Sequence, residues 1–422
     1  MALQTTRTLP QLQLECENLK LEVKPKGKKL QKDDYIRALR EYYIESYGGY
    51  NAIPKSLNLM LQIESPMLAA QYKTCKPEQQ DKMWNTNDWY AEEKEDGVRI
   101  VNFFLQDEKY NAYSRNNSTK DFLPISYGEK ICLDNVDFSK IRDTFILDSE
   151  CICINPRIST ILGKKGIVTE TQLQAVTALL SMNKEDSIRI QREENCPLLF
   201  KVFDCLYYNG EWLLDKPLIE RRKYLKKALQ QLQLAGFKAQ LPKSNISNKK
   251  AFYNAIIKEH GEGIILKRID SKYTATSSRA HRDWVKVKRS FSETAEMEGL
   301  CDTIDGFITG FEPGSKDKAN SNLVGTLIVS TYLRDEEGNT KLHEIAHISS
   351  ITDDLRKEIT TYDSEGNPVL KESFYNQVVE VDGQCISARA MRLRHAVLVR
   401  FRPDRSSDTC ILDESFLKSL IL

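Results

Sequence analysis

The chain has 422 residues, of which 41% are apolar and 29% are charged. This length predicts two or three domains, and the composition excludes a disordered or fibrous protein. Lysine and arginine number 61 against 60 acidic residues, so the net charge of +1 gives no overall attraction to nucleic acid or membrane. No apolar run approaches the roughly 20 residues that span a bilayer, and no basic-then-apolar leader begins the chain. We therefore expect an intracellular protein, cytoplasmic or nuclear, with no membrane association.

The ten cysteines show no pairing pattern. They include no C-x-x-C motif, and the closest two, Cys151 and Cys153, lie in a predicted strand. Buried free thiols in a reducing compartment are therefore expected, rather than a disulfide framework or a zinc site.

Residues 1–60 predict a small helical unit. Apolar residues recur at helical spacing on both sides of a basic loop, and Gly48 and Gly49 close the unit. Between residues 20 and 32 there are six lysines and one acid, Glu22. This concentration of positive charge predicts a loop that faces phosphate groups.

Residues 61–293 mix short β-rich runs with helical segments, which predicts a mixed α/β or α+β domain. The expected strands are residues 99–105, 144–154, 198–208, 263–267 and 284–288. The clearest helix is residues 219–232, and the polar segment 292–298 predicts a hinge. Short strands separated by turn signals dominate residues 294–422, which predicts a small barrel.

The first motif that could carry chemistry is K-x-D-G-x-R, formed by Lys94, Asp96, Gly97 and Arg99. One interpretation is a strand, an Asp-Gly turn and a second strand with solvated charges. Alternatively, Lys94 is a nucleophile, which requires burial or nearby positive charge to lower the pKa of its amine.

Cations and carboxylates that could surround such a lysine occur further along the chain. Lys286 and Lys288 share one face of a predicted strand, which is also the pattern of a solvated lysine face. Glu150 and Glu262 each lie in or at the start of an apolar strand. Two carboxylates near a phosphate-binding cationic cluster predict a magnesium site, because substrate phosphates can complete the shell of that ion.

In chain order, these segments resemble the nucleotidyltransferase motifs of ATP-dependent DNA ligases over roughly residues 64–410. The Lys94 motif resembles the one that holds the adenylated lysine, and Ser114-Arg115-Asn116 resembles the next. Phe203-Asp204 is similar to the motif whose ring stacks on adenine, and residues 65–69 resemble the start of the catalytic domain.

The resemblance implies a set of site residues. Lys94 would be the catalytic nucleophile, Glu92 would read the adenine amino group, and Glu150 and Glu262 would hold the metal. The residues implied to bind ATP are Glu92, Arg99, Arg115, Glu150, Phe203, Lys267, Lys286, Lys288, Arg402 and Arg405. The last motif of the family is R-x-D-K, whereas this chain has Arg405 at its final position, which keeps the charge but changes its geometry.

The resemblance also implies the fold and the reaction. The fold would be multidomain α+β, with a SAP-like helical DNA-binding module at 1–60, an ATP-grasp-like nucleotidyltransferase core at 61–293 and an OB-fold barrel at 294–422. The protein would be a monomer that uses ATP and Mg²⁺ or Mn²⁺. It would seal 5′-phosphate/3′-hydroxyl nicks in duplex DNA through lysyl-AMP and DNA-adenylate, in DNA replication or repair.

Other members of the superfamily remain alternatives at this point. An RNA ligase or an mRNA capping guanylyltransferase would share Lys94 and the carboxylates. Arg99, the form of residues 284–288 and the implied OB-fold with its arginine-rich final motif favour a DNA ligase, and Glu92 argues for adenine rather than guanine. An NAD-dependent ligase would need a zinc-binding cysteine quartet. A non-catalytic nick-binding protein would not need the intact Lys94.

A second motif, His343-Glu344-Ile345-Ala346-His347, fits the H-E-x-x-H pattern of zinc proteases. The turn-like residues 337–339 precede it, so the segment is predicted to be the second strand of a hairpin. On a strand, histidines four residues apart lie about 13 Å from each other, too far to share one metal ion.

Overall fold

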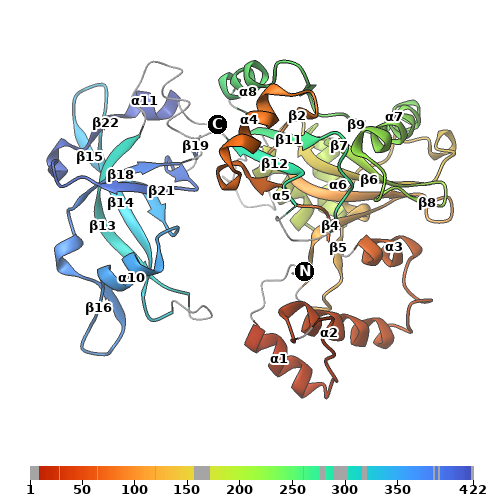
Figure 1. Cartoon of the computed structure of the whole chain (residues 1–422), viewed down its shortest axis with the longest axis horizontal. Helices are drawn as coiled ribbons and strands as arrows, with labels where there is room; N and C mark the ends of the chain where they lie inside the picture. The colour runs from red at the N-terminus through yellow and green to blue at the C-terminus, as the bar shows by residue number, and fades with distance from the viewer. Residues whose placement is uncertain are drawn as a thin grey trace. The chain divides into compact units, whose positions relative to one another are not determined.

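The computed structural model describes residues 9–27, 29–63, 65–118, 120–155, 172–259, 261–275, 281–288, 303–315, 321–383, 385–387 and 390–419. Contacts divide the chain into two units, Met1–Ile256 with Gly263–Val287 and Ile257–Glu262 with Lys288–Leu422. The first unit contains helices and two β-sheets, and the second is built mainly of strands (Figure 1). The hinge predicted at residues 292–298 lies outside the described residues.

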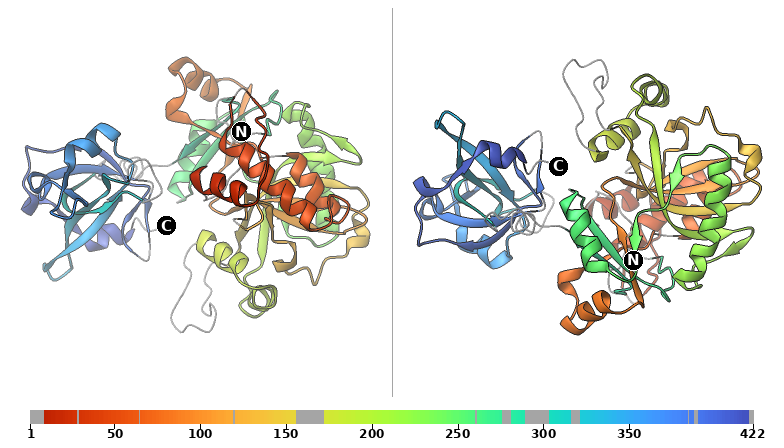
Figure 2. Two further views of the ribbon diagram at one scale, coloured as in Figure 1. Left: turned by 90° about the horizontal axis from the view of Figure 1, so that it is seen from below. Right: turned by 90° about the horizontal axis from the view of Figure 1, so that it is seen from above.

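Three helices open the first unit. They are α1 (Leu9–Asn18), α2 (Lys32–Ser46) and α3 (Lys55–Ile63). Leu12 of α1 packs with Ile36 and Leu39 of α2 in a small apolar cluster, and Phe122 from the two-sheet part of the unit completes it. Figure 2 shows α1 and α2 in front of the sheets from below and behind them from above, so these helices lie on one side of the unit.

The first sheet of this unit has five strands. In spatial order they are β1 (Ala70–Gln71), β12 (Trp284–Lys288), β11 (Gly263–Arg268), β2 (Trp89–Glu93) and β10 (Ser244–Asn245). β1 and β12 are parallel, whereas β2 is antiparallel to both of its neighbours. The sheet is therefore assembled from segments far apart in the sequence.

The second sheet has seven strands. Its path runs β5 (Pro124–Ser126), β4 (Asn111–Asn117), β3 (Val98–Phe104), β6 (Phe145–Cys153), β7 (Leu198–Tyr208) and β8 (Glu211–Trp212), with β9 (Ala239–Gln240) parallel to β7. The helices of this part of the unit are α4 (Pro77–Asn85), α5 (Gln172–Ser181), α6 (Lys184–Glu193), α7 (Leu218–Leu234) and α8 (Lys249–Lys258).

Strand periodicity decides which side chains of the second sheet reach the site. Along β3, Ile100 and Phe104 belong to the core that contains α5, α6 and α7. Val101 and Phe103 belong to a different core, shared with α3 and with Trp284 of the first sheet. Arg99 lies two residues before Val101 and so points to this second side of the strand.

The second unit is a strand-rich body with its own core. Its main sheet runs β15 (Thr340–Ile348), β14 (Val324–Arg334), β13 (Ile304–Pro313), β18 (Val378–Asp382) and β21 (Val397–Phe401), with β22 (Ile411–Asp413) beside β14. The smaller elements are α10 (Asp353–Ile359), β16 (Thr360–Tyr362), β17 (Pro368–Leu370), β19 (Cys385–Ile386), β20 (Leu393–Arg394) and α11 (Glu414–Ser419). Together the two units give a mixed α/β protein.

Two further sequence predictions can be compared with the structure. His343 and His347 lie on β15, which pairs with β14 in an antiparallel hairpin, so the H-E-x-x-H segment is a strand as predicted.

Among the cysteines whose side chains are described, eight are free thiols. None of the described helices is long and apolar enough to cross a membrane.

Candidate active site

Lys94 lies in a short connection between the two sheets of the first unit. β2 ends at Glu93 in the five-stranded sheet, and β3 begins at Val98 in the seven-stranded sheet. The flanking strands thus form no hairpin, although the connection contains the predicted Asp-Gly pair. The backbone amide of Lys94 donates to the carbonyl of Gly263, 2.9 Å away, which ties the connection to β11.

Gly97 allows this connection to approach the second sheet closely. A Cβ atom at this position would lie 2.2 Å from the carbonyl oxygen of Cys151 on β6. Any other residue would therefore push the connection away from β6, because this backbone cannot move aside cheaply.

Glu92, two residues before Lys94, is a buried carboxylate held by three donors. It is 1% exposed, and the Tyr90 hydroxyl donates to its Oε1 atom at 3.1 Å. Arg222 of α7 also contacts Oε1, and Lys267 of β11 forms an ion pair with Oε2. Burial alone would raise the pKa of Glu92, but Lys267 and Arg222 outweigh burial and hold the pKa below its usual value. Glu92 is therefore an ionised acceptor.

Lys267 lies against two aromatic rings. Its Nζ atom is 4.5 Å from the ring centroid of Phe203 and 4.2 Å from that of Trp284. Burial lowers the pKa of Lys267, and the ion pair with Glu92 only partly offsets this. The structure thus brings Glu92, Phe203 and Lys267 together, three of the residues predicted to bind the nucleotide.

Arg99 has most of its guanidinium occupied by the protein itself. Nε and Nη2 donate to the carboxylate of Asp148 at 2.9 and 2.5 Å, and Nη1 donates to the carbonyl of Met67 at 2.6 Å. The hydroxyl of Tyr273 donates to the same carboxylate at 2.6 Å. Burial opposes the charge of Arg99, but Asp148 raises the pKa of the guanidinium above its usual value. These contacts make Arg99 a tether between β3, β6 and residues 65–69.

Glu150 lies in the middle of the second sheet, directly across from Arg99 on β3 and Lys201 on β7. Lys201 also forms an ion pair with Glu95, the residue after Lys94, with the Nζ and Oε1 atoms 3.0 Å apart. Sequence reasoning missed Lys201. Its position opposite Glu150 depends on a strand pairing that no local spacing reveals.

Glu262 and Lys288 form a second ion pair, 2.9 Å long, at the beginning of β11 and the end of β12. Lys286 lies on the same strand, opposite Gln71 of β1. No group of three or more His, Cys, Asp or Glu side chains is placed to hold a metal ion in the described part of the chain. Carboxylates such as Glu150 and Glu262 nonetheless suit Mg²⁺, which takes few protein ligands when phosphates and water supply the rest.

The remaining predicted residues lie elsewhere. Arg115 is half-buried on β4. In the second unit, Asp305 lies 3.3 Å from the guanidinium of Arg402 and 2.5 Å from that of Arg405. Arg402 also contacts Asp404 at 2.8 Å, so carboxylates of the same unit surround these arginines.

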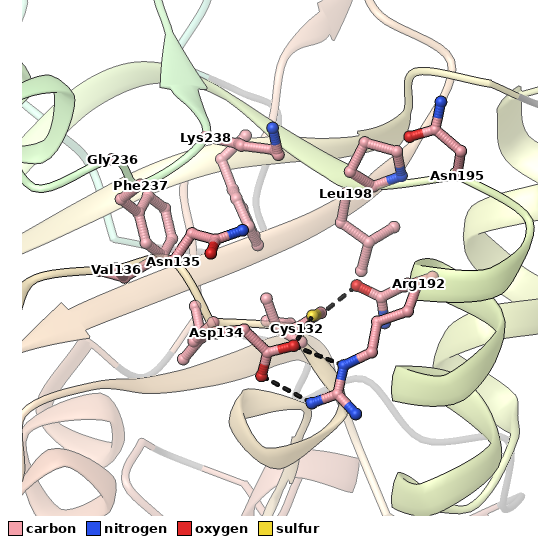
Figure 3. Close-up of a pocket in the computed structure, with 15 residues that line it drawn as sticks. Cys132, Asp134, Asn135, Val136, Arg192, Asn195, Leu198, Gly236, Phe237 and Lys238 are labelled. Atoms are coloured by element: carbon pink, nitrogen blue, oxygen red, sulfur yellow. Dashed lines mark hydrogen bonds and ion pairs between the residues drawn. The ribbon is translucent and has the colours of Figure 1, made fainter.

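A separate hollow of about 250 Å³ contains none of the predicted residues. Figure 3 shows Cys132, Asp134 and Arg192 on one side of it and Phe237 and Lys238 on another. Arg192 binds the Asp134 carboxylate through two hydrogen bonds of 2.5 and 2.6 Å, and both side chains are about half exposed. The charges of Arg192 and Asp134 therefore neutralise each other, and the pair gives no indication of a catalytic group in this hollow.

Comparison with known proteins places these features in a family. Residues 66–288 match the family model described as ATP dependent DNA ligase domain. "DNA ligase 4" of Candida glabrata is 30% identical over 260 residues, which are 59% of this chain and 24% of that protein. "Probable DNA ligase" of Dictyoglomus thermophilum is 34% identical over 246 residues, 57% of this chain and 37% of that protein. The chain thus spans well under half of the length of these relatives.

Solved structures of low sequence identity also align with the chain. The ATP-dependent DNA ligase from bacteriophage T7 in complex with ATP is 16% identical, with a TM-score of 0.35, and the alignment covers 80% of this chain and 98% of that one. A Lig E DNA ligase is 14% identical with a TM-score of 0.48, and the alignment covers 80% of this chain and 99% of that one. The family model covers more than half of the sequence, and the chain therefore belongs to the ATP-dependent DNA ligase family.

Proposed function

We propose that this protein seals nicks in duplex DNA with ATP as co-substrate. The observation that carries the proposal is the placement of Lys94 directly after a strand whose ionised, buried Glu92 pairs with Lys267, a lysine that lies over the Phe203 ring. A carboxylate acceptor next to an aromatic ring is suited to a purine base with an amino group. The lysine that follows is then near the phosphate end of the same nucleotide.

The proposed reaction has three phosphoryl-transfer steps. The Lys94 amine attacks the α-phosphorus of ATP, forms a P–N bond and expels pyrophosphate. The 5′-phosphate at the nick then attacks this phosphorus, forms a pyrophosphate linkage to AMP and releases the lysine. Finally the 3′-hydroxyl attacks the 5′-phosphate, the strand is joined and AMP leaves. Lys286 and Lys288 are proposed to balance the negative charge that builds up on the phosphates.

The metal site is part of the same proposal. Glu150 and Glu262 would hold Mg²⁺ or Mn²⁺ together with ATP phosphates, and the bound ion would neutralise phosphate charge. Because Glu262 is paired with Lys288, that lysine would share the carboxylate with the ion or turn to a phosphate.

The domain assignment is also a proposal. Residues 1–60 would contact DNA, and residues 61–293 would form the adenylation domain. Residues 294–422 would form an OB-fold domain that brings Arg402 and Arg405 to the leaving pyrophosphate. The protein would act as a monomer. The antiparallel strands of the second unit and its two arginines support this role.

Covalent labelling tests the proposed function. The purified chain is incubated with Mg²⁺ and, separately, with α-labelled ATP, GTP or NAD, and the protein band is examined after denaturation. We expect label from ATP alone, its loss in Lys94→Ala, and its discharge when nicked duplex DNA is added and sealed.

The other outcomes identify the alternatives. Label from GTP would indicate a capping enzyme, and discharge only on nicked RNA would indicate an RNA ligase. A chain that takes no label from any nucleotide would contradict an enzymatic role and favour a nick-binding protein.

A further inference from the structure

The buried carboxylate of Glu92 has two partners that lie outside the motifs recognised in the sequence. They are Tyr90, on the same strand, and Arg222, on α7. Arg222 also donates to the Tyr90 hydroxyl at 2.9 Å, and its guanidinium lies 5.0 Å from the centroid of the Tyr90 ring. The three side chains thus form a closed cluster in which Arg222 holds both other members.

The cluster leaves one oxygen of Glu92 available to a ligand. Each carboxylate oxygen accepts about two hydrogen bonds. Oε1 receives both the Tyr90 hydroxyl and Arg222, so its capacity is filled. Oε2 receives only Lys267 in the described structure. An incoming amino group must therefore meet Oε2.

If the base stacks on Phe203 as proposed, Lys267 cannot hold the Glu92 carboxylate in place while that base is bound. The Lys267 ammonium lies over the Phe203 ring and would occupy the same space as the base. Once it is displaced, Tyr90 and Arg222 are the partners that still hold Glu92. Without Arg222, a buried carboxylate would take up a proton or rotate towards water, and a protonated acid no longer accepts through both oxygens.

We infer that Arg222, assisted by Tyr90, is a positioning residue that holds Glu92 in the orientation that selects a purine with a 6-amino group. This inference rests on the proposed function, since it concerns the base of the nucleotide that labels Lys94. It assigns to α7 a part in nucleotide choice.

The test compares two nucleotides that differ only at the group Glu92 would read. ATP carries the 6-amino group, and purine riboside triphosphate lacks it. We measure the rate of lysine labelling as kcat/KM for each nucleotide. Wild-type protein should prefer ATP by at least roughly tenfold, since a hydrogen bond to a charged group is worth that much or more.

Arg222→Gln should reduce this preference to less than about threefold, through a slower reaction with ATP and little change with purine riboside triphosphate. Arg222→Lys, which keeps a cation, should retain part of the preference, and Tyr90→Phe should reduce it less than Arg222→Gln does. Arg189→Gln is the matched control, because Arg189 forms ion pairs with Asp186 and Glu193 on the exposed face of α6.

Equal slowing of both nucleotides by Arg222→Gln, with the preference intact, would overturn the inference and leave Arg222 a structural residue. Arg222 lines a hollow of about 280 Å³ with Ile219 and Ile246, so the shorter glutamine meets no packed core there. If Arg222→Gln nevertheless fails to fold, Tyr90→Phe decides, because it removes a single hydroxyl. Wild-type protein that takes no label from ATP would overturn the proposed function, a result distinct from an unchanged preference in the variants.

Discussion

Asp204 and Arg221 form a fully buried ion pair beside the candidate site. Nε and Nη2 of Arg221 donate to the two carboxylate oxygens, each at 2.8 Å, and both side chains are 0% exposed. Nη1 donates to the carbonyls of Lys216 and Ser271. Because Asp204 follows Phe203 and Arg221 precedes Arg222, this pair fixes the strand that carries the proposed base-stacking ring and the helix that carries the proposed positioning residue.

Removing one partner of this pair should destabilise the protein strongly. In Arg221→Met we expect the free energy of unfolding to fall by about 3–5 kcal/mol, because Asp204 is left buried without a counter-charge. Urea unfolding measures the change. The control Arg189→Met, at an exposed ion pair, should cost less than about 1 kcal/mol. Similar decreases in the free energy of unfolding of the two variants would show that the buried ion pair stabilises the protein no more than an exposed one.

At the scale of single elements, Phe122 connects the N-terminal helices to the two-sheet part of the first unit. Its side chain is fully buried among residues of α1 and α2, and its backbone has a φ of +59°, which non-glycine residues rarely adopt. Arg40 of α2 donates to the Phe122 carbonyl at 3.0 Å. The helices thus hold the chain segment between β4 and β5 in an otherwise unfavourable conformation.

Phe122→Ala should loosen this connection. We expect a loss of about 3–5 kcal/mol in the stability of the helical unit, from the lost apolar contacts and the cavity left behind. Limited proteolysis should then cut within residues 19–31 faster than in the wild type. Leu234→Ala, at a side chain that is 75% exposed, is the control. Unchanged cleavage in Phe122→Ala would mean that the helices are held by other contacts.

Element boundaries were predictable where a strand shows its own periodicity. β7 and β12 begin and end at the predicted residues, and α7 extends the predicted helix by one residue at its start and two at its end. The sequence did not indicate α4 or α8, which are short and have few residues to define a helical face. Nor did it indicate that β2 and β3 belong to different sheets, since pairing partners far along the chain decide that.

The same distinction applies to the site. Lys94 lies in a compact motif whose spacing pointed to it, and the family resemblance of nearby motifs pointed to Glu92 and Lys267. Asp148 and Arg222 reach the site through a strand register and a helix orientation, which the local sequence does not encode. The signal for Arg222 would have been a cation on the inward face of the predicted helix, next to Arg221.

For the whole molecule, the balance of charges hides a local excess. Lys20, Lys24, Lys26 and Lys29 are exposed in the first unit. Asp34 shapes this basic loop by accepting hydrogen bonds from the backbone amides of Lys26 and Gln31 at 3.0 and 2.7 Å. The lysines are thus presented from an ordered turn next to α2.

If this loop contacts DNA, binding to nicked duplex should depend on salt through it. Replacing Lys24, Lys26 and Lys29 by serine should make the slope of log affinity against log salt less steep by roughly 2 to 3, because each lost phosphate contact contributes about 0.9. Fluorescence anisotropy at several salt concentrations measures this slope. Serine at Lys223, Lys226 and Lys227 of α7 removes the same charge as a control. Equal slopes for the two triple variants would exclude a specific role for the loop.

During synthesis of the protein, the strand before Lys94 is made long before the strand that pairs with it. β2 is paired with β10 and β11, and β11 follows Lys94 by about 170 residues. A ribosome adding 5–20 residues per second needs roughly ten to thirty seconds to supply that partner. Until then the nascent chain carries Lys94 just after a strand that lacks its β11 partner, and Glu92 lacks the ion-pair partner that Lys267 provides. If Lys94 is the proposed nucleophile, its capacity to react with a nucleotide is acquired only after β11, which ends at Arg268, has been made.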